Sequence, residues 1–471
     1  MMHLKLDKIR QSLQGRTDFE LHCHTMTLEA VDVDLPKFCG PGAIRIGASG
    51  NLSFIMYAQS VMAVHIPERL KAGEVVPKDL IYRLVAIDGD KTEWISEQLD
   101  GFRIQPSICS NNAVITGKLY DLRSCTPIFP EGISAELTES SLTLFVFDQI
   151  DIPLNTRTVT EITVDGEHFS GGGAKLNVAK VDVREIGFTF TKEDDFLRVR
   201  AISAKLPSGI HNRIVESLQF ILARPVWWTM MCHEAGNNLL THIRSLPDYV
   251  HDRTPFPPIK SVAFYDPTKC VWQLFAKYFE HASRHDDDDS WHPMSRFVYS
   301  AIEARAAGFD TYRLALGVAI EGILKTAFDK IYAPADDFLL VVEDVLKHTN
   351  DWQCPIAWDG EQSFRQRLRG SLGQLRSPRA DDRLRTLCKM NVLSEDELFA
   401  WKKMRNETAH ACRPSQVPHQ TELDQIAKVT ILMHKLVFQA IDYSGSYADY
   451  TTHGFPNREF SAVKPDCMRP Q

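Results

Sequence analysis

The hydrophobic period of this chain changes along its length, and that change limits what the chain can fold into. Before residue 205, short alternating or β-branched runs recur, separated by Gly, Asn, Asp and Pro residues. From residue 293 to about 443, apolar residues instead return at spacings of three and four, as on one face of a helix. A chain of 471 residues is also too long for one ordinary hydrophobic core. We therefore predict an α+β multidomain protein, in which a β-rich N-terminal domain precedes an all-α bundle.

Several runs in the N-terminal part have the length and the β-branched composition of strands. They are residues 19–24, 80–87, 113–119, 142–147 and 158–164. Because no long helical pattern intervenes between them, an antiparallel sandwich or barrel-like arrangement is favoured over a doubly wound parallel sheet. We predict that this β-rich domain covers residues 1–205.

Residues 206–290 show mixed patterns and are predicted to connect the two domains. Ser208 is a suitable N-cap for a helix whose apolar residues follow at spacings of three and four from Ile210. A strand is expected further on, at residues 261–265.

The acidic run Asp286–Asp289 lies near the end of this connecting region. Three histidines flank it, namely His281, His285 and His292, and Asp and His together suggest a metal site. Four adjacent carboxylates, however, lack the spacing of a calcium loop and the scaffold of a zinc site. We therefore predict a solvated loop at this boundary.

The C-terminal part is predicted to be a helical bundle over residues 291–445. Its expected helices are 295–307, 310–332, 336–348, 361–375, 380–390, 394–410 and 421–443. Ser394 and Glu397 have the spacing of a capping box, in which each side chain satisfies a free backbone donor of the other residue. Residues 446–471 are rich in Tyr, Gly, Pro and Ser, and we expect them to form an irregular tail.

Composition excludes some classes of protein. The 53 basic and 61 acidic residues give a net charge of −8, so any affinity for nucleic acid must be local. No stretch reaches the roughly 18 uncharged apolar residues of a membrane helix. The N-terminus carries charges where a signal peptide needs its apolar region, and the ten Cys residues form no C-x-x-C pair. We therefore expect a cytoplasmic protein with reduced thiols and no membrane partner.

The segment Trp401–Ala411 is the most informative for chemistry. It reads as the end of an amphipathic helix that carries Arg405, Asn406 and His410. Asn406 and His410 are four residues apart and share a face, whereas Arg405 and His410 lie about 140° apart around an ideal helix. Arg405 and His410 therefore converge only if the Arg side chain wraps sideways or the last turn loosens.

The pattern Arg-Asn-x-x-x-His, followed by a loop and a long apolar helix, resembles the Rx4–6H signature of the HEPN superfamily. That resemblance implies a helical bundle and a metal-independent ribonuclease that acts as a homodimer. The upstream stretch 315–325 resembles an early helix of the family that often carries an inward acidic residue, which would make Glu321 a supporting residue. The layout of a β-rich domain, a stretch such as 216–222 and then this bundle resembles ApeA-like proteins of bacterial anti-phage defence. It implies an abortive-infection effector with a phage-derived trigger, and a sensor or specificity role for the N-terminal domain.

The residue types fit RNA cleavage. RNA carries its own nucleophile, the 2′-hydroxyl beside the scissile phosphate. A histidine such as His410 can take that proton or protonate the leaving 5′-oxygen. The guanidinium of Arg405 can hold the phosphate, and Asn406 can orient the imidazole or bond a phosphate oxygen. We therefore expect an RNA substrate and neither a metal nor another cofactor.

A concentrated basic patch precedes the motif. Residues 365–389 contain eight basic and two acidic residues, in a chain that is acidic overall. The basic residues are Arg365, Arg367, Arg369, Arg376, Arg379, Arg383, Arg385 and Lys389. We predict that they bind the phosphate backbone of RNA. The alternative is a solvated basic face, or partners for acids such as Glu343 and Asp344.

Two other functions are compatible with the sequence. The first is a bundle that serves only for dimerisation or for RNA or nucleotide binding, although the presence of both Arg405 and His410 favours an enzyme. The other alternative rests on Glu20–Thr25, which resembles the opening strand of PHP-type metal phosphoesterases. His22 and His24 would point the same way on a strand and bind one metal, but the later His and Asp motifs of that family are not found.

Overall fold

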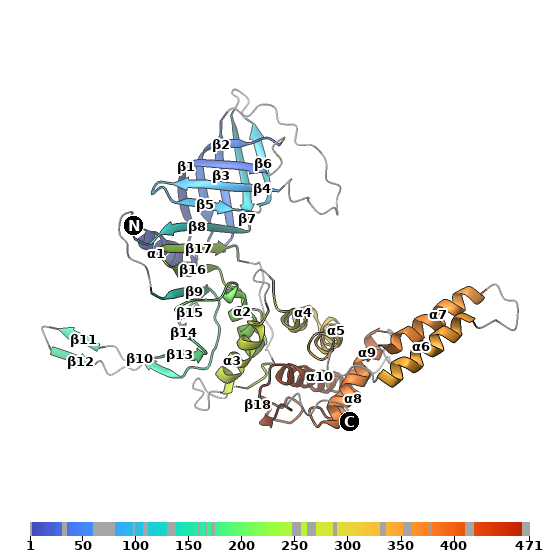
Figure 1. Ribbon diagram of the computed structural model, residues 1–471. Helices are drawn as coiled ribbons and strands as arrows, with labels where there is room; N and C mark the ends of the chain where they lie inside the picture. The colour runs from blue at the N-terminus through green and yellow to red at the C-terminus, as the bar shows by residue number, and fades with distance from the viewer. Residues whose placement is uncertain are drawn as a thin grey trace. The chain divides into compact units, whose positions relative to one another are not determined.

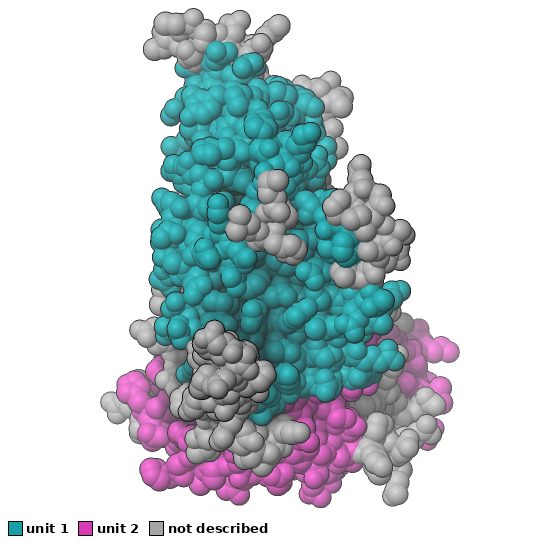
Figure 2. Space-filling model, turned by 90° about the vertical axis from the view of Figure 1, so that its left-hand side faces the viewer, with its two compact units in different colours: residues 1–211, 226–250, 263–267 teal, residues 212–225, 251–262, 268–471 magenta. Residues whose placement is uncertain are grey.

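The computed structural model describes most of the chain. The described residues are 2–30, 35–59, 81–97, 99–106, 112–129, 138–158, 161–164, 167–170, 175–246, 256–260, 270–285, 290–329, 336–351, 360–376, 378–409 and 419–463. They form two compact units (Figure 2). Unit 1 holds the described residues of 1–211 and 226–250, and unit 2 holds those of 212–225, 251–262 and 268–471. The predicted α+β multidomain class is confirmed, because strands dominate the N-terminal part and helices the C-terminal part (Figure 1).

Unit 1 is built on a 15-stranded sheet in which each paired neighbour runs antiparallel. The order across the sheet is β10 (Thr156–Thr158), β13 (Lys175–Val183), β14 (Ile186–Lys192), β15 (Leu197–Ser203), β9 (Ser140–Val146), β16 (Met230–Ala235), β17 (Asn238–Arg244), β8 (Asp121–Pro127), β5 (Glu93–Ser96), β4 (Tyr82–Asp88), β1 (Phe19–Ala30), β2 (Phe38–Ile46), β3 (Leu52–Ala58), β7 (Ala113–Leu119) and β6 (Leu99–Pro106). A separate hairpin joins β11 (Glu161–Val164) to β12 (Glu167–Ser170).

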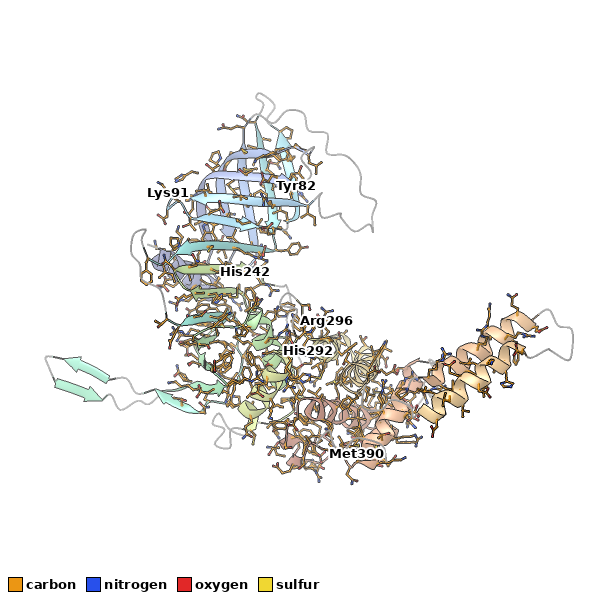
Figure 3. The ribbon with its side chains drawn as sticks, in the orientation of Figure 1. Tyr82, Lys91, His242, His292, Arg296 and Met390 are labelled. Carbon is orange, nitrogen blue, oxygen red and sulfur yellow. The ribbon has the colours of Figure 1, made fainter. Side chains whose placement is uncertain are left out.

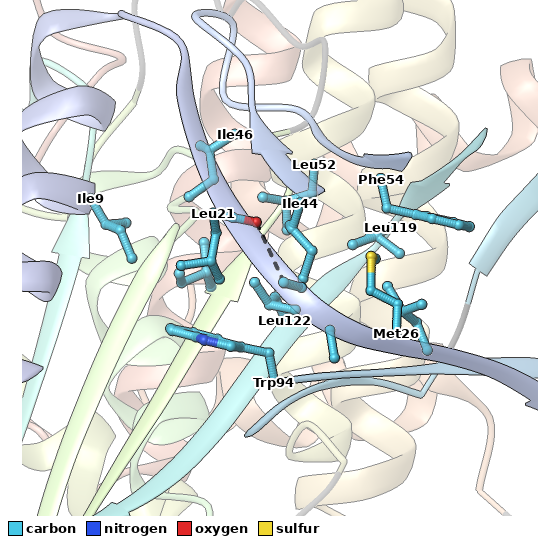
Figure 4. Packing of buried hydrophobic residues seen from close by; sticks show 14 of the residues in the cluster. Ile9, Leu21, Met26, Ile44, Ile46, Leu52, Phe54, Trp94, Leu119 and Leu122 are labelled. Carbon is cyan, nitrogen blue, oxygen red and sulfur yellow. Dashed lines mark hydrogen bonds between the residues drawn. The ribbon is translucent and has the colours of Figure 1, made fainter. Parts of the chain in front are cut away.

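Alternation along the strands decides which face of the sheet is buried. In β3, Leu52, Phe54 and Met56 lie in the hydrophobic core, while the residues between them point to the other face. The same core includes Leu21 of β1, next to Ile44 of β2 (Figure 4). One face of this part of the sheet is therefore sealed by apolar packing, and the other carries both polar and apolar side chains, such as Ser53 and Ile55.

The helix α1 (Met2–Gly15) packs on this core, although we expected mainly strands here. Its apolar residues Leu6, Ile9 and Leu13 follow at spacings of three and four and are buried in the core cluster. Lys5 binds the buried carboxylate of Asp88 at 2.5 Å, which also fixes the helix to β4. The helical spacing was present in the sequence, but the charges around it masked the signal.

The predicted connecting region 206–290 is divided between the two units. The expected helix is present as α2 (Ile210–Leu222), nearly all of it in unit 2, and it begins two residues after Ser208. β16 and β17 return to unit 1 and lie between β9 and β8 in the sheet. The strand expected at 261–265 lies outside the described residues. The region thus supplies core elements to both units.

Unit 2 contains the predicted helices. They are α4 (Pro293–Ala307), α5 (Phe309–Ala327), α6 (Asp336–Asp351), α7 (Glu361–Gly373) with the 3₁₀ turn η2 (Gln374–Arg376), α8 (Ala380–Lys389), α9 (Glu395–Ala409) and α10 (His419–Ala440). α3 (Cys270–Ala282) precedes them and was not predicted. The capping box is confirmed: the Ser394 amide donates to Glu397 at 2.9 Å, and the Glu397 amide donates to Ser394 Oγ at 3.2 Å.

The last described residues are more ordered than the irregular tail we expected. β18 (Gly445–Ala448) pairs with β19 (Asn457–Phe460) as an antiparallel hairpin. Aromatic burial explains the difference, because Phe460 packs on Phe438 of α10 at 5.5 Å between ring centroids. None of the described helices is both long enough and apolar enough to cross a membrane.

Candidate functional site

The described part of the predicted motif, Arg405 and Asn406, lies near the C-terminal end of α9, and Arg405 contacts α5. Trp401 and Met404 are buried in unit 2, so the neighbouring Arg405 emerges at the edge of the helix. Its Nε donates to Oε1 of Glu321 on α5. The two side chains remain 44% and 40% exposed, respectively. The structure thus brings together two residues that the sequence proposed for one site, although they are 84 positions apart.

A cleft of about 720 Å³ opens beside this ion pair. Glu321 comes from α5, Trp401, Lys402, Arg405 and Asn406 come from α9, and the other lining residues are Gln374, Arg379, Ala380, Asp381 and Asp382. Asn406 is exposed at this cleft, next to Arg405. The cleft is therefore polar and large enough for a nucleotide-sized group.

Charges in the cleft are partly compensated. Asp381 accepts from Lys402 at 2.5 Å and from Arg385 at 3.1 Å. Burial raises the pKa of Asp381, but the hydrogen bonds from Lys402 and Arg385 outweigh burial and hold that pKa below its ordinary value. The exposed Arg379 guanidinium, in contrast, pairs with none of the described residues. Arg379 thus adds a positive charge at the rim of the cleft with no ion pair to a described side chain.

A buried arginine fixes α9 behind the motif. Arg313 of α5 is 2% exposed, and its Nη2 donates to Oε2 of Glu407 at 2.5 Å and to Oε1 of Gln425 at 3.2 Å. Its Nη1 lies 3.7 Å from Glu422 of α10. Glu407 stands two residues after Arg405, so this network sets the rotation of α9 about its axis. We did not predict this network, although the sequence places Arg313 within the apolar pattern of α5.

His410 lies outside the described residues, the last of which in this segment is Ala409. The distance from Arg405 to His410 is therefore not given by the structure. The assignment of His410 as the proton-transfer group stays a prediction.

The predicted basic patch is divided by the structure. Four of its members bind acids: Arg365 binds Glu361, Arg376 binds Glu343, Arg383 binds Asp329 and Arg385 binds Asp381. Arg383 is buried on the inward face of α8, so its place in a surface patch was wrong. The remaining members are exposed, and no ion pair to a described residue holds them: Arg367, Arg369, Arg379 and Lys389. Only Arg379 of these four lines the cleft.

The two histidines of the metal alternative lie on β1. His22 and His24 are both exposed, and the pairing of β1 with β2 shifts its register between Cys23 and Met26. Over the described residues, no group of three or more His, Cys, Asp or Glu side chains has the geometry of a metal site.

The three histidines that flank the acidic run form an aromatic cluster in unit 2 (Figure 3 labels His292). The ring of His292 lies 4.8 Å from that of His281 and 5.6 Å from that of His285, measured between centroids. His292 caps α4, because its Nδ1 accepts from the Met294 amide at 3.2 Å. Burial, together with the charges of the neighbouring His281, His285 and Arg213, lowers the pKa of His292 to about 3. The acidic run 286–289 itself lies outside the described residues.

A polar cluster in unit 1 joins β8 to β17. His242 Nε2 lies 3.0 Å from Asp121 Oδ2, and Arg123 donates to the same oxygen at 2.9 Å (Figure 3 labels His242). Burial lowers the pKa of His242, although the contact with Asp121 opposes that shift. The ring also contacts Trp228 edge-on at 4.9 Å. The cluster therefore has the buried pairing of a structural contact.

No family model matches this chain, and neither a curated protein nor a solved structure is significantly similar to it.

Proposed function

We propose that the chain is a metal-independent endoribonuclease of the HEPN type, which acts as an abortive-infection effector against phage. The observation that carries this proposal is the placement of Arg405 against Glu321 at the edge of a polar cleft. An exposed ion pair of this kind contributes only about 0–1 kcal/mol to stability, so stability alone is a weak reason for it.

The geometry leaves Arg405 able to bind a phosphate. Only its Nε is engaged by Glu321 among the described residues, and a guanidinium has further donors on Nη1 and Nη2. Glu321 would hold the plane of the guanidinium, so that those donors face the cleft. Arg379 would add a second positive charge at the rim.

In the proposed reaction, the 2′-hydroxyl of RNA attacks the adjacent phosphorus as His410 takes its proton. The bond from phosphorus to the 5′-oxygen breaks, and that oxygen is protonated by a second acid. Arg405 stabilises the charge that develops on the phosphate oxygens. Asn406, exposed at the cleft, would orient the imidazole or bond a phosphate oxygen. The first product is a 2′,3′-cyclic phosphate.

A single motif supplies one histidine, so the second acid would come from another copy in a homodimer. Exposed apolar side chains of α5 and α9 support this assembly. Leu314 and Val318 are 51% and 56% exposed and share the face of α5 that carries Glu321. Phe399, 69% exposed, shares the face of α9 that carries Asn406. Exposed apolar side chains grouped in this way are typical of a protein interface.

The test is cleavage of labelled RNA by the purified protein in the presence of EDTA. The wild type should release products with a 2′,3′-cyclic or 3′-phosphate and leave DNA of the same sequence intact. His410→Ala should abolish cleavage. His419→Ala is the matched control, because His419 is 94% exposed and lies just beyond the motif, and it should cleave as the wild type does. Activity that needs metal, or that persists in His410→Ala, would reject the proposal.

A further inference from the structure

A second groove lies in unit 1, on the face of the sheet opposite to the hydrophobic core. It has a volume of about 720 Å³ and is lined by side chains of β1, β2, β3, β7 and β6. The register explains how it forms: Arg45 of β2 lies opposite Ser53 of β3, which lies opposite Lys118 of β7. Two residues further along β3, Ile55 lies opposite Thr116 of β7, and Thr116 in turn lies opposite Arg103 of β6. The groove thus crosses neighbouring strands instead of following one of them.

The described charged side chains that line the groove carry a net positive charge. Arg103 and Lys118 are exposed, and no ion pair with a described residue neutralises them. Arg45 is paired with Glu20, the one carboxylate among the described side chains that line the groove. Adjacent strands lie about 4.8 Å apart, so the cations of β2, β7 and β6 span about 14 Å across the sheet. A row of cations with this reach suits a chain of phosphates better than a single small anion.

A bulge in β6 places one of these cations. The pairing of β6 with β7 shifts register between Leu99 and Phe102, and Gly101 has a φ of +82° there. Gly101 adopts this left-handed conformation without strain, and such bulges re-aim the side chains that follow. Arg103 consequently comes opposite Thr116 on the face of the groove.

An exposed aromatic ring continues the same face. Tyr57 is 53% exposed and lies two residues beyond Ile55 on β3, so its side chain points to the side of the groove. A cationic groove next to an accessible aromatic ring is the combination that binds single-stranded nucleic acid, because bases stack on the ring while cations follow the backbone.

We propose that this face of β2, β3, β7 and β6 binds single-stranded RNA. The inference rests on the proposed function in that the bound strand would be the substrate of the nuclease. Arg103, Lys118 and Arg45 would hold phosphates, and Tyr57 would stack on a base. The N-terminal unit would thereby select single-stranded targets by backbone and base stacking, without reading a fixed sequence.

The test measures binding separately from cleavage. The full-length chain is titrated against a fluorescent 2′-O-methyl oligouridylate of about 12 nucleotides, which lacks the nucleophile and stays intact. Arg103→Glu with Lys118→Glu should weaken binding by at least about tenfold, and the slope of log K against log salt should become shallower by about 1.4. Tyr57→Ala should weaken binding by at least about fivefold. The matched control is Arg200→Glu on β15, an exposed arginine far from the groove in strand order, which should bind as the wild type does.

Binding that is equal in the wild type and the charge-reversal variant would overturn the inference. So would the absence of RNA binding together with capture of an acidic peptide such as polyglutamate, which would indicate a protein partner. The two proposals fail separately. Unchanged binding by the variants with His410-dependent cleavage rejects only the groove, and groove-dependent binding without cleavage rejects only the nuclease.

Discussion

Arg405 is the residue whose geometry most directly links structure to the proposed chemistry. Its planar fork can hold two oxygens of one phosphate, whereas an ammonium offers a single point of charge. Arg405→Lys should therefore reduce the rate of RNA cleavage by about 100-fold or more although the charge is kept. Glu321→Gln should reduce kcat by about 10-fold, because the guanidinium loses the carboxylate that orients it.

The matched control for these variants is Lys403→Ala, since Lys403 is an exposed cation of the same helix that does not line the cleft. Single-turnover cleavage of labelled RNA measures all of them. If Lys403→Ala were as impaired as Arg405→Lys, the effect would be one of general charge and not of the motif.

At the residue scale, the sequence predicted Arg405, Asn406 and Glu321 but not the network behind them. The motif and the acidic position follow from a short pattern, which is local information. The contact of Arg313 with Glu407 joins residues 94 positions apart, and no local pattern encodes which buried arginine meets which acid. Arg383 shows the opposite error: its charge suggested the surface, but helical phase turns it inward beside Leu384 and Leu387.

At the scale of the helix, α9 depends on Arg313. Arg313→Met should lower the free energy of unfolding by about 3–5 kcal/mol, because Glu407 and Glu422 would lose their buried cation. Urea unfolding measures the loss. Arg367→Met on α7, where the side chain is exposed, is the control and should change stability by less than about 0.5 kcal/mol. Adding Glu407→Gln to Arg313→Met should recover part of the stability, and no recovery would contradict the assigned pairing.

The start of α4 should make unit 2 sensitive to acid. The pKa of His292 is about 3 in the folded chain and near 6.5 when unfolded, so the unfolded state binds more protons between these values. The stabilisation is complete above pH 6.5 and is lost as pH falls towards 3. His292→Asn keeps an N-cap but removes the titrating ring. When the pH falls from 7 to 4.5, the free energy of unfolding should fall by about 1–2 kcal/mol less in His292→Asn than in the wild type. This range allows for solvent screening of the partly exposed ring.

Urea titrations followed by circular dichroism at the two pH values provide the comparison. His453→Asn is the control, since that histidine is exposed in a turn of unit 2 and makes no such cap. An unchanged pH dependence in His292→Asn would show that other groups account for it.

The elements themselves were predictable to very different degrees. The helices from 293 onward repeat apolar residues with the helical period, and that period alone located them. α1 was missed because charged residues surround its apolar spacing, and the β18–β19 hairpin was missed because its strands are short and owe their order to tertiary burial. For β18–β19, that burial is a contact between Phe460 and Phe438. The order of strands in the large sheet joins distant segments, and local alternation carries no information about it.

At the scale of the whole molecule, we expect a homodimer that forms through α5 and α9. Leu314→Glu with Val318→Glu should place charges in that interface and yield a monomer, as measured by light scattering coupled to size exclusion. The control is Leu340→Glu with Val341→Glu on α6, whose side chains are 69% and 60% exposed, and it should remain dimeric. A wild type that is already monomeric would rule out the dimer. A control variant that dissociates while the Leu314→Glu, Val318→Glu variant stays dimeric would place the interface elsewhere.

Removal of residues 1–205 should not leave a clean helical fragment. β16 and β17 remain in such a variant but lose their neighbours β9 and β8. The backbone groups on the outer edge of each strand are then left without a partner strand. We expect this variant to aggregate. Replacing residues 226–250 by a short Gly-Ser linker in the same variant should restore solubility, as judged by size exclusion. Equal solubility of the two variants would mean that the strand pair folds or is tolerated without the sheet.

Along the chain, α2 of unit 2 lies between strands of unit 1, and this order affects folding during synthesis. The strand pair β16–β17 fills the middle of the sheet, yet it is made after both of its neighbours and after a helix that belongs elsewhere. Until residue 244 has left the ribosome, the nascent sheet is two half-sheets with facing edges that nothing pairs. Slow translation in this window, or scarce chaperone, would therefore reduce the yield of folded protein more than the same delay after residue 300.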